Sequence, residues 1–332
     1  MRTSALRELR SSFPDAQICC YVDPIGAEVL SLSSDQHRVV IVVNRSKESR
    51  LLYVWRRLLL HWTIWREGFD ILVDFYNGPS SHRLLLTSGA KMQLMVRNAE
   101  IICVPPARPV SVRVHRNRHH LSNLYFALLD HISTPVSSDT DVVPWVSHSP
   151  PGGAACGFDD RHYFVSLATG DPRKNLPSAL LADIANWLYQ ECGATPLIAC
   201  NPGQEHLQDD FAQALDAHNI PSTRLGRMDL SELLNLMRVV RLSILPDTGL
   251  FHLAVASGTP VLGVFTHTHP LHVDPFLDRV HIVFKENRAA GLDPHGLPHG
   301  SQKITGQEAL GALRVLMREM DSKEWSYDRV HA

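Results

Sequence analysis

The chain has 332 residues, of which 44% are hydrophobic, so it is long enough to bury the cores of two domains or of one large one. Its formal net charge is −2 at pH 7, and this balance does not favour a nucleic-acid partner. No apolar run approaches the roughly 20 residues that a membrane-spanning helix needs, so we predict no such helix.

The N-terminus and the cysteines both favour a cytoplasmic protein. Residues 1–16 are charged throughout and lack the apolar centre of a secretory signal. The six cysteines form no C-x-x-C pair, which favours reduced packing residues over disulfides or a metal site. Four of them fall in strands that we predict to be buried, namely Cys19, Cys20, Cys103 and Cys200.

The first half of the chain alternates between strand and helix patterns, which predicts a doubly wound parallel sheet. Residues 38–43 form a continuous apolar run, typical of a parallel strand that is covered on both faces. The predicted elements are a helix at 4–12, strands at 17–22 and 38–43, a short helix from 23, helices at 47–66 and 79–88, strands at 70–75 and 100–104, and a helix at 118–132. The long helix has apolar residues at helical spacing, at Leu51, Leu52, Trp55, Leu58, Leu59 and Trp62.

The second half repeats this alternation after a segment rich in Pro and Gly, so we predict an α/β protein with two Rossmann-like domains. Two such domains that face each other across a cleft form the GT-B architecture, with ligands at the carboxyl ends of the strands. The predicted boundaries are an N-terminal domain at 1–135, a linker at 136–157, a second domain at 158–305, and a terminal helix and tail at 306–332.

The elements of the second domain follow from the same patterns. We predict strands at 163–168, 196–200, 222–225, 243–246, 261–265 and 280–284, and helices at 177–192, 205–218, 229–240, 250–257 and 307–321. Residues 286–305 are rich in Gly, Pro and His, and we predict a loop there.

The stretch at residues 243–265 reads as strand, tight turn, helix, turn and strand. A helix that opens at the carboxyl end of a strand points unpaired N–H groups and a positive dipole end outward, which suits an anion. Asp247 and Thr248 are good N-cap residues, Gly249 allows a ligand to approach the backbone closely, and His252 lies one turn further on. An ordinary capped βαβ unit explains the same residues without any ligand.

The pattern D-T-G-L-x-H-L-A-x-A-x-G-T-P-V at residues 247–261 resembles the donor-site signature of glycosyltransferase family 9, the bacterial heptosyltransferases. The resemblance extends over most of the chain and implies the GT-B fold. It also implies a set of donor-binding residues. Thr169 and Gly170 match a turn that lies near the donor diphosphate, and Lys174 matches a lysine that pairs with a phosphate. Glu205 matches an acidic residue that contacts the nucleotide, and Met228 matches a residue that lines the base. The remaining matches are Asp247, Thr248, Gly249 and His252.

Three of these matches also have a simpler explanation. Lys174 alone reads as a solvated loop lysine, Glu205 suits a helix N-terminus in any case, and Met228 alone reads as a packing residue.

The resemblance implies an inverting transferase that needs no metal or other cofactor. Its donor would be a nucleotide-sugar, ADP-heptose in the first instance, and its acceptor a lipopolysaccharide core or another cell-envelope glycan. The expected location is the cytoplasm, with peripheral contact with the inner membrane as a further expectation. The alternative is a catalytically inactive relative that still binds a nucleotide-sugar.

The catalytic base is not identified by the resemblance. The family opens with an apolar strand and a glycine-containing turn that carries the basic carboxylate, and the resemblance places this region before Met1. A truncated start, an inactive relative and a substitute acid all explain this. Asp74 and Asp23 are the candidate substitutes, although Asp74 also reads as a turn-forming residue.

The sequence is rich in histidine, and His267, His269 and His272 resemble a metal cluster in composition. Thr268-His269-Pro270 also fits a Thr-x-Pro turn that the family carries at this point. We therefore expect no metal site.

Overall fold

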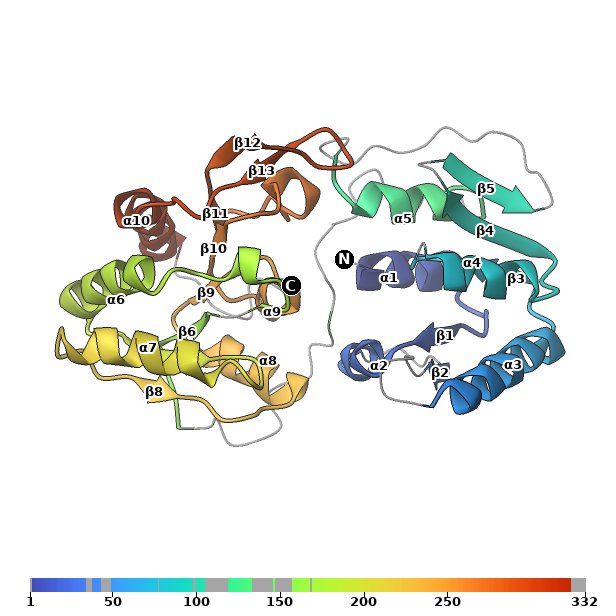
Figure 1. Cartoon of the computed structure of the whole chain (residues 1–332), viewed down its shortest axis with the longest axis horizontal. Coiled ribbons are helices and arrows are strands. Elements are labelled where there is room, and N and C mark those ends of the chain that lie inside the picture. Colours follow the sequence, from blue (N-terminus) through green and yellow to red (C-terminus); the bar gives the residue numbers. More distant parts are fainter. Residues whose placement is uncertain are drawn as a thin grey trace. The chain divides into compact units, whose positions relative to one another are not determined.

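The computed structural model describes residues 2–33, 38–42, 49–76, 78–97, 100–104, 119–132, 146, 157–167 and 169–323. The chain divides into two compact units, Met1–Val142 and Val143–Ala332, whose elements are labelled in Figure 1. The predicted linker at 136–157 lies almost entirely outside the described residues.

The second unit is built on a six-stranded sheet in the order β11-β10-β9-β6-β7-β8, and every neighbouring pair is parallel. Its strands are β6 (His162–Ser166), β7 (Thr195–Ala199), β8 (Thr223–Arg224), β9 (Ser243–Leu245), β10 (Val261–Phe265) and β11 (Val280–Phe284). The chain runs outward from β6 through β7 to β8, returns to β9, and then runs outward the other way. The predicted α/β class with a doubly wound parallel sheet is therefore confirmed here.

Five helices connect or flank these strands, α6 (Ser178–Cys192), α7 (Glu205–Asp216), α8 (Leu230–Val239), α9 (Gly249–Ser257) and α10 (Gly306–Lys323). The start of α8 is fixed by a capping box. The Asp229 carboxylate accepts from the Glu232 N–H, and the Glu232 carboxylate accepts from the Asp229 N–H. The last helix, α10, packs on α6 and β11.

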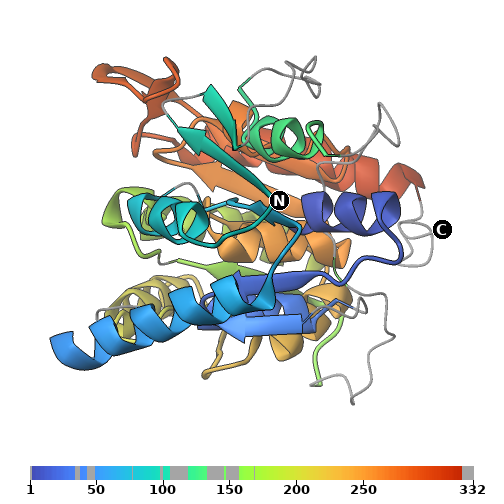
Figure 2. The same cartoon turned by 90° about the vertical axis from the view of Figure 1, so that its right-hand side faces the viewer.

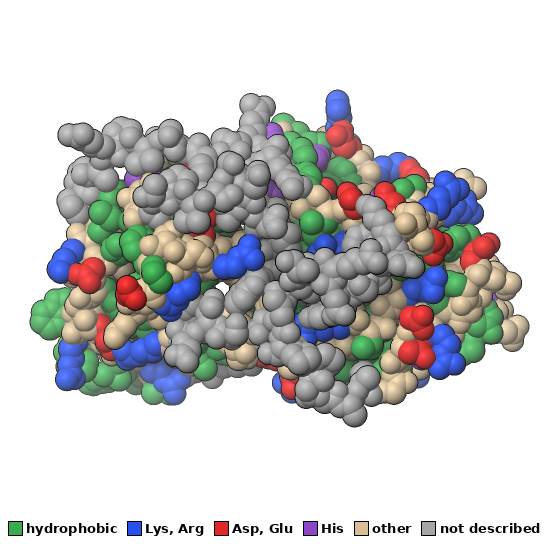
Figure 3. All heavy atoms as spheres, turned by 180° about the vertical axis from the view of Figure 1, so that it is seen from behind, with side chains coloured by type: hydrophobic (Ala, Val, Ile, Leu, Met, Phe, Trp, Pro, Cys, Tyr) green, Lys and Arg blue, Asp and Glu red, His purple; other side chains and the backbone are tan. Residues whose placement is uncertain are grey.

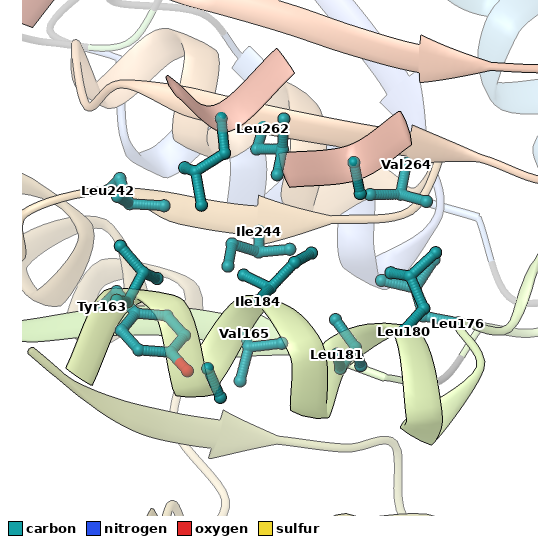
Figure 4. Close-up of a cluster of buried hydrophobic side chains, with 14 of the residues drawn as sticks. Tyr163, Val165, Leu176, Leu180, Leu181, Ile184, Leu242, Ile244, Leu262 and Val264 are labelled. Atoms are coloured by element: carbon teal, nitrogen blue, oxygen red, sulfur yellow. The ribbon is translucent and has the colours of Figure 1, made fainter. Parts of the chain in front are cut away.

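The core of this unit lies between the sheet and α6 (Figure 4). Val165 from β6, Ile184 from α6, Ile244 from β9 and Leu262 from β10 are all fully buried. Burying one such side chain contributes roughly 1.5–3 kcal/mol, so the continuous apolar runs of the strands supply the main stabilisation.

In its described residues, the first unit has two smaller sheets. β1 (Cys19–Val22) is parallel to β2 (Arg38–Ile41), and β3 (Ile71–Val73), β4 (Met92–Arg97) and β5 (Glu100–Val104) form the second sheet. Its helices are α1 (Arg2–Ser12), α2 (Pro24–Ser31), α3 (Arg50–Glu67), α4 (Pro79–Leu86) and α5 (Ser122–Leu129). Figure 2 shows α3 as the long blue helix of this unit.

Three predictions about strands are wrong. β4 was not predicted from the sequence, and β5 runs antiparallel to β4 rather than in a parallel sheet. The two strands are separated by two residues, and a parallel pair needs a crossover of a dozen or more. The predicted loop at 286–305 instead contains an antiparallel hairpin of β12 (Glu286–Leu292) and β13 (Pro298–Gly300).

The burial predicted for β2 is also wrong. Its pairing with β1 is parallel as expected, but Val39 and Ile41 are 38% and 55% exposed. An apolar run identifies a strand, but it does not guarantee that another layer covers both faces of that strand.

We expect the first unit to exchange its backbone amides faster than the second. Within the described residues, its sheets have two and three strands and its core clusters are small, whereas the second unit has a six-stranded sheet over one large cluster. Local opening costs less free energy where fewer apolar groups are buried together. Hydrogen exchange followed by mass spectrometry measures this, and equal protection of β1 and β6 would contradict it.

Candidate functional site

The loops that follow the strands of the second unit meet at one edge of its sheet, because all six strands are parallel. The strand order reverses between β6 and β9, which are direct neighbours. Ligands of open α/β sheets bind outside the carboxyl ends of the strands at such a switch point. Thr169 and Lys174 follow β6, and Asp247 follows β9. The topology therefore brings these residues, distant in sequence, to the position where a ligand is expected.

The centre of this arrangement is an ion pair between Lys174 and Asp247. The Lys174 Nζ lies 2.6 Å from Asp247 Oδ2, and the two side chains are 24% and 12% exposed. Burial alone raises the pKa of the Asp247 carboxyl. The Lys174 ammonium, a hydrogen bond from Thr268 and the nearby His252 outweigh burial, so the pKa lies below its ordinary value. The carboxylate is therefore charged at neutral pH, and the lysine is not a merely solvated loop residue.

Lys174 ends a short 3-10 helix, η2 (Pro172–Lys174), which is held from several strands. The Thr169 N–H donates to the Asn175 side chain at 2.9 Å, and the Gln204 side chain after β7 donates to the Thr169 carbonyl at 3.2 Å. From the other side of the sheet, the Thr266 hydroxyl after β10 donates to the Arg173 carbonyl at 2.8 Å. The backbone that presents the lysine is thus fixed before any ligand arrives.

Four residues that support η2 were not predicted from the sequence, namely Asn175, Gln204, Thr266 and Gln302. Gln302 donates to the Pro172 and Arg173 carbonyls at 3.3 and 3.2 Å. A polar residue after a buried strand was the available signal for Gln204 and Thr266. Gln302 carries no local signal, because it lies about 130 residues from its partners.

The start of α9 differs from the expected capped helix. Thr248 occupies the N-cap position, but its side chain makes no capping hydrogen bond, and the Asp247 carboxylate pairs with Lys174 instead. A Cβ built on Gly249 or Gly170 would meet no heavy atom within 4 Å. The helix terminus therefore keeps its positive dipole end beside open space, and this suits an anion.

The other predicted donor-binding residues lie on the same edge of the sheet. Glu205 opens α7, and a hydrogen bond from the Gly203 N–H at 2.9 Å is the main reason for its lowered pKa. Met228 is half-buried in the connection between β8 and α8. His252 lies on α9, with its ring centroid 5.4 Å from that of Phe251. Their roles toward a ligand stay predictions.

The two candidate bases in the first unit make local hydrogen bonds. Asp74 is 7% exposed, and its carboxylate accepts from the Tyr76 N–H at 2.9 Å and from the Ser81 hydroxyl at 2.7 Å. The Asp23 carboxylate accepts from the Gly26 N–H at 2.7 Å and caps α2. Both acids therefore stabilise the turn that follows a strand.

The three histidines of the composition-based metal cluster each contact other residues, and His269 and His272 also meet edge to face, with ring centroids 6.4 Å apart. His269 Nδ1 accepts from the Leu271 N–H at 3.2 Å, and His272 pairs with the Asp293 carboxylate. His267 stacks on His299 with ring centroids 4.6 Å apart. Among the described residues, no group of three or more His, Cys, Asp or Glu side chains is placed to hold a metal ion.

Replacing Asp293 should destabilise the β12–β13 hairpin and remove part of its pH dependence. Burial raises the pKa of Asp293, but bonds from His272 and from the Leu297 and His295 amides lower it to about 2. A depressed carboxyl pKa contributes stability above its unfolded value of about 4, and this stability is lost as the pH falls toward 2. We expect Asp293→Asn to lower the free energy of opening the hairpin by about 1.5–3 kcal/mol at pH 7 and by little at pH 2. Hydrogen exchange of the hairpin amides measures this free energy.

The matched control is Glu286→Gln in the same hairpin, where an exposed pair with Arg288 should contribute little. If Asp293→Asn and the unmodified chain lost hairpin protection equally at every pH, the Asp293 interactions would not stabilise the hairpin.

Comparisons with known proteins give the same fold. The structure matches glycosyltransferase family 9 from Veillonella parvula with a TM-score of 0.71 and 16% identity, over 96% of this chain and 92% of that one. It matches ADP-heptose lps heptosyltransferase II from E. coli with a TM-score of 0.69 and 17% identity, over 96% and 94%. Identities this low support the fold, and both matches agree with the predicted GT-B class.

The sequence comparisons each cover about half of the chain. A region of 162 residues is 26% identical to the lipopolysaccharide core heptosyltransferase OpsX from Haemophilus influenzae, and it spans 48% of this chain and 46% of that protein. The match therefore covers about half the length of the curated relative. The profile of glycosyltransferase family 9 (heptosyltransferase) matches residues 126–293, just over half of the chain. Because this profile covers more than half of the sequence, the chain belongs to glycosyltransferase family 9.

Proposed function

We propose that this protein is a glycosyltransferase that moves a heptose from a nucleotide-sugar, ADP-heptose in the first instance, to a lipopolysaccharide core or another cell-envelope glycan. The observation that carries the proposal is the Lys174–Asp247 pair beside the uncapped start of α9. The names of the relatives support the heptose and the lipopolysaccharide acceptor. We propose the cytoplasm as the location, in keeping with a nucleotide-sugar donor.

The proposed chemistry needs stabilisation of a departing nucleoside diphosphate. Negative charge develops on the phosphates as the bond to the anomeric carbon breaks. The Lys174 ammonium, the first amides of α9 and the helix dipole would face that charge, and Thr169 and Gly170 would form the turn beside it. These groups are fixed in advance by the bonds to η2, so little reorganisation is needed during the reaction. The proposal gives no step to a metal ion.

Asp247 would then change partners during donor binding. In the structure, its carboxylate keeps the lysine ammonium at the switch point. When a diphosphate arrives, the ammonium can turn toward a phosphate oxygen, while the carboxylate accepts a hydrogen bond from a sugar hydroxyl. Glu205, Met228 and His252 complete the proposed donor site toward the nucleotide and the sugar.

Incubating the purified protein with ADP-heptose and a heptose-deficient lipopolysaccharide core tests the proposal. Release of ADP together with a mass increase of one heptose on the acceptor is the expected result. A preference for a different nucleotide-sugar would correct the donor, and an absence of both binding and transfer for any nucleotide-sugar would overturn the proposal. Unchanged turnover in excess EDTA would support a transfer that does not use a metal ion.

The alternative is a relative that binds the nucleotide-sugar without transferring the sugar. An inverting transfer needs a carboxylate that removes the proton of the acceptor hydroxyl. Asp74 and Asp23 are the candidate bases in the described part of the chain, yet Asp74 already accepts bonds from Tyr76 and Ser81, and Asp23 accepts from Gly26. If the unmodified protein and the Asp74→Asn variant both bind the donor without releasing ADP, the result would favour this alternative.

A further inference from the structure

Helix α3 packs against its own unit with its less apolar face. The inward positions are Tyr53, Arg57, Leu60, His61 and Ile64, which recur at helical spacing and are buried or half-buried. The Arg57 guanidinium donates to the Ser80 carbonyl at 3.0 Å, and His61 Nδ1 lies 2.5 Å from the Thr87 hydroxyl. Ile64 is fully buried. These contacts fix the rotation of α3, and hence which side chains point outward.

The opposite face of α3 is strongly apolar and exposed. At about 100° per residue, Leu51, Trp55 and Trp62 lie opposite the buried Ile64. We call the exposed large hydrophobic side chains of α3 the outer face. Its members, with their exposed fractions, are Leu51 (79%), Leu52 (45%), Val54 (46%), Trp55 (65%), Leu58 (59%), Leu59 (52%), Trp62 (53%) and Trp65 (62%).

This orientation is the reverse of an ordinary surface helix, which turns its apolar stripe to the core. Proteins that work as monomers in water rarely keep a continuous apolar patch of this kind, and such patches mark interaction sites. Three of the six tryptophans of the chain lie on this one helix face. We therefore expect a binding partner to cover the outer face.

The charges around the outer face indicate what that occupant is. The sequence of α3 contains four arginines, of which Arg57 points inward, and one glutamate, Glu67, which pairs with Arg38 at 2.8 Å. The Arg66 guanidinium lies 5.2 Å from the centre of the Trp62 ring, at the end of the apolar stripe. Figure 3 shows hydrophobic and Lys or Arg side chains beside one another at lower left, on the side of the picture that holds the first unit.

Tryptophan and leucine on one face, with arginine at its margin, is the composition of a helix that lies in a membrane interface. Tryptophan rings sit at the level of the headgroups, and arginine side chains reach the phosphates while their stems stay on apolar surface. A protein partner of equal area would need a matching acidic rim, whereas a bilayer with anionic lipids supplies negative charge along the whole helix.

We propose that the outer face of α3 binds the surface of a membrane that contains anionic phospholipids. The helix lies parallel to the bilayer, with Trp55 and Trp62 inserted to the depth of the headgroups and with Arg56 and Arg66 against the phosphates. The inference deepens the proposed function, since it names a surface by which the protein could reach a lipid-linked glycan. It rests on α3 alone, so vesicle binding and sugar transfer can fail independently.

Vesicle flotation at about 0.1 M salt tests the proposal. One set of vesicles contains phosphatidylcholine alone, and the other also contains roughly 30–40% phosphatidylglycerol. We expect the protein to float with the anionic vesicles and to stay behind with the neutral ones. Trp55→Ser with Trp62→Ser should weaken binding at least about tenfold, and Arg56→Gln with Arg66→Gln roughly tenfold or more, since each basic residue near the surface contributes severalfold. Tryptophan emission should shift to shorter wavelength on binding.

The control variant is Leu292→Ser with Val315→Ser, which removes exposed apolar side chains of the second unit and should bind as the unmodified protein does. Circular dichroism should match in all variants, because every altered side chain is exposed. Binding that ignores the tryptophan substitutions, or no binding to anionic vesicles, overturns the proposal. The proposal is also overturned if the protein does not bind vesicles but associates with itself, and if the tryptophan substitutions abolish that association. The outer face would then bind a second copy of the chain.

Discussion

Replacing Lys174 by methionine should lower the turnover of the proposed transfer by about 100–1,000-fold, which corresponds to about 2.7–4 kcal/mol of barrier for one preorganised charged contact. The substitution keeps the length of the side chain but removes the ammonium that lies 2.6 Å from Asp247. Steady-state assays of ADP release measure the change. Titration calorimetry with ADP gives a second readout, which remains usable if the protein binds without transferring.

Arg173 is the matched control for this experiment. It lies next to Lys174 in η2, but its side chain is 68% exposed and pairs with Asp171. We expect Arg173→Met to change turnover and ADP affinity only severalfold at most. If Lys174→Met retained both the turnover and the ADP affinity of the unmodified protein, the switch-point site would lose its central residue, and the donor would have to bind elsewhere.

Replacing Phe251 by alanine should destabilise the second unit by about 3–5 kcal/mol, the usual range for removing a buried aromatic ring. Phe251 is fully buried in α9, and its ring meets that of Phe265 edge to face with centroids 5.1 Å apart. The ring also packs against Gly263 of β10, where an added Cβ would lie 3.1 Å from it. Urea unfolding, followed by a spectroscopic signal from the second unit, measures the loss of free energy of unfolding.

The same substitution should weaken donor binding, because Phe251 fixes the first turn of α9 against β10. Phe251→Leu is the graded control, since it keeps part of the volume and should lose less stability. A Phe251→Ala protein with an unchanged urea midpoint would show that the ring is not part of the cooperative core.

The elements of the second unit were largely predictable because their signals are local. The predicted strand at 261–265 coincides with β10 at both ends, since a fully apolar run there lies between Pro260 and a polar loop. The turn at residues 246–249 was predictable for the same reason, because β9, the turn and α9 follow one another directly, whereas Lys174 was expected only from the family resemblance. Continuous burial on both faces leaves a clear pattern in the sequence.

Contacts between distant segments were not predictable. Nothing near Asp247 indicates that its carboxylate pairs with a lysine 73 residues away instead of capping α9. The Gly and Pro content of residues 286–305 suggested a loop, whereas Asp293 and Gly296 form the turn of a hairpin. In α3, both faces carry large apolar residues, so periodicity identified a helix without showing which face packs inward.

The two separate sheets of the first unit also affect how the protein behaves on warming. Within the described strands, β1 pairs only with β2, and β3 pairs only with β4, so each has one side without a strand neighbour. Such an edge is a template for pairing with another chain, and brief opening of this unit would expose more of it. Heat inactivation should therefore be irreversible and depend on protein concentration. A melting temperature from a scan would then report the rate at which the first unit aggregates, while β6 to β11 are still folded.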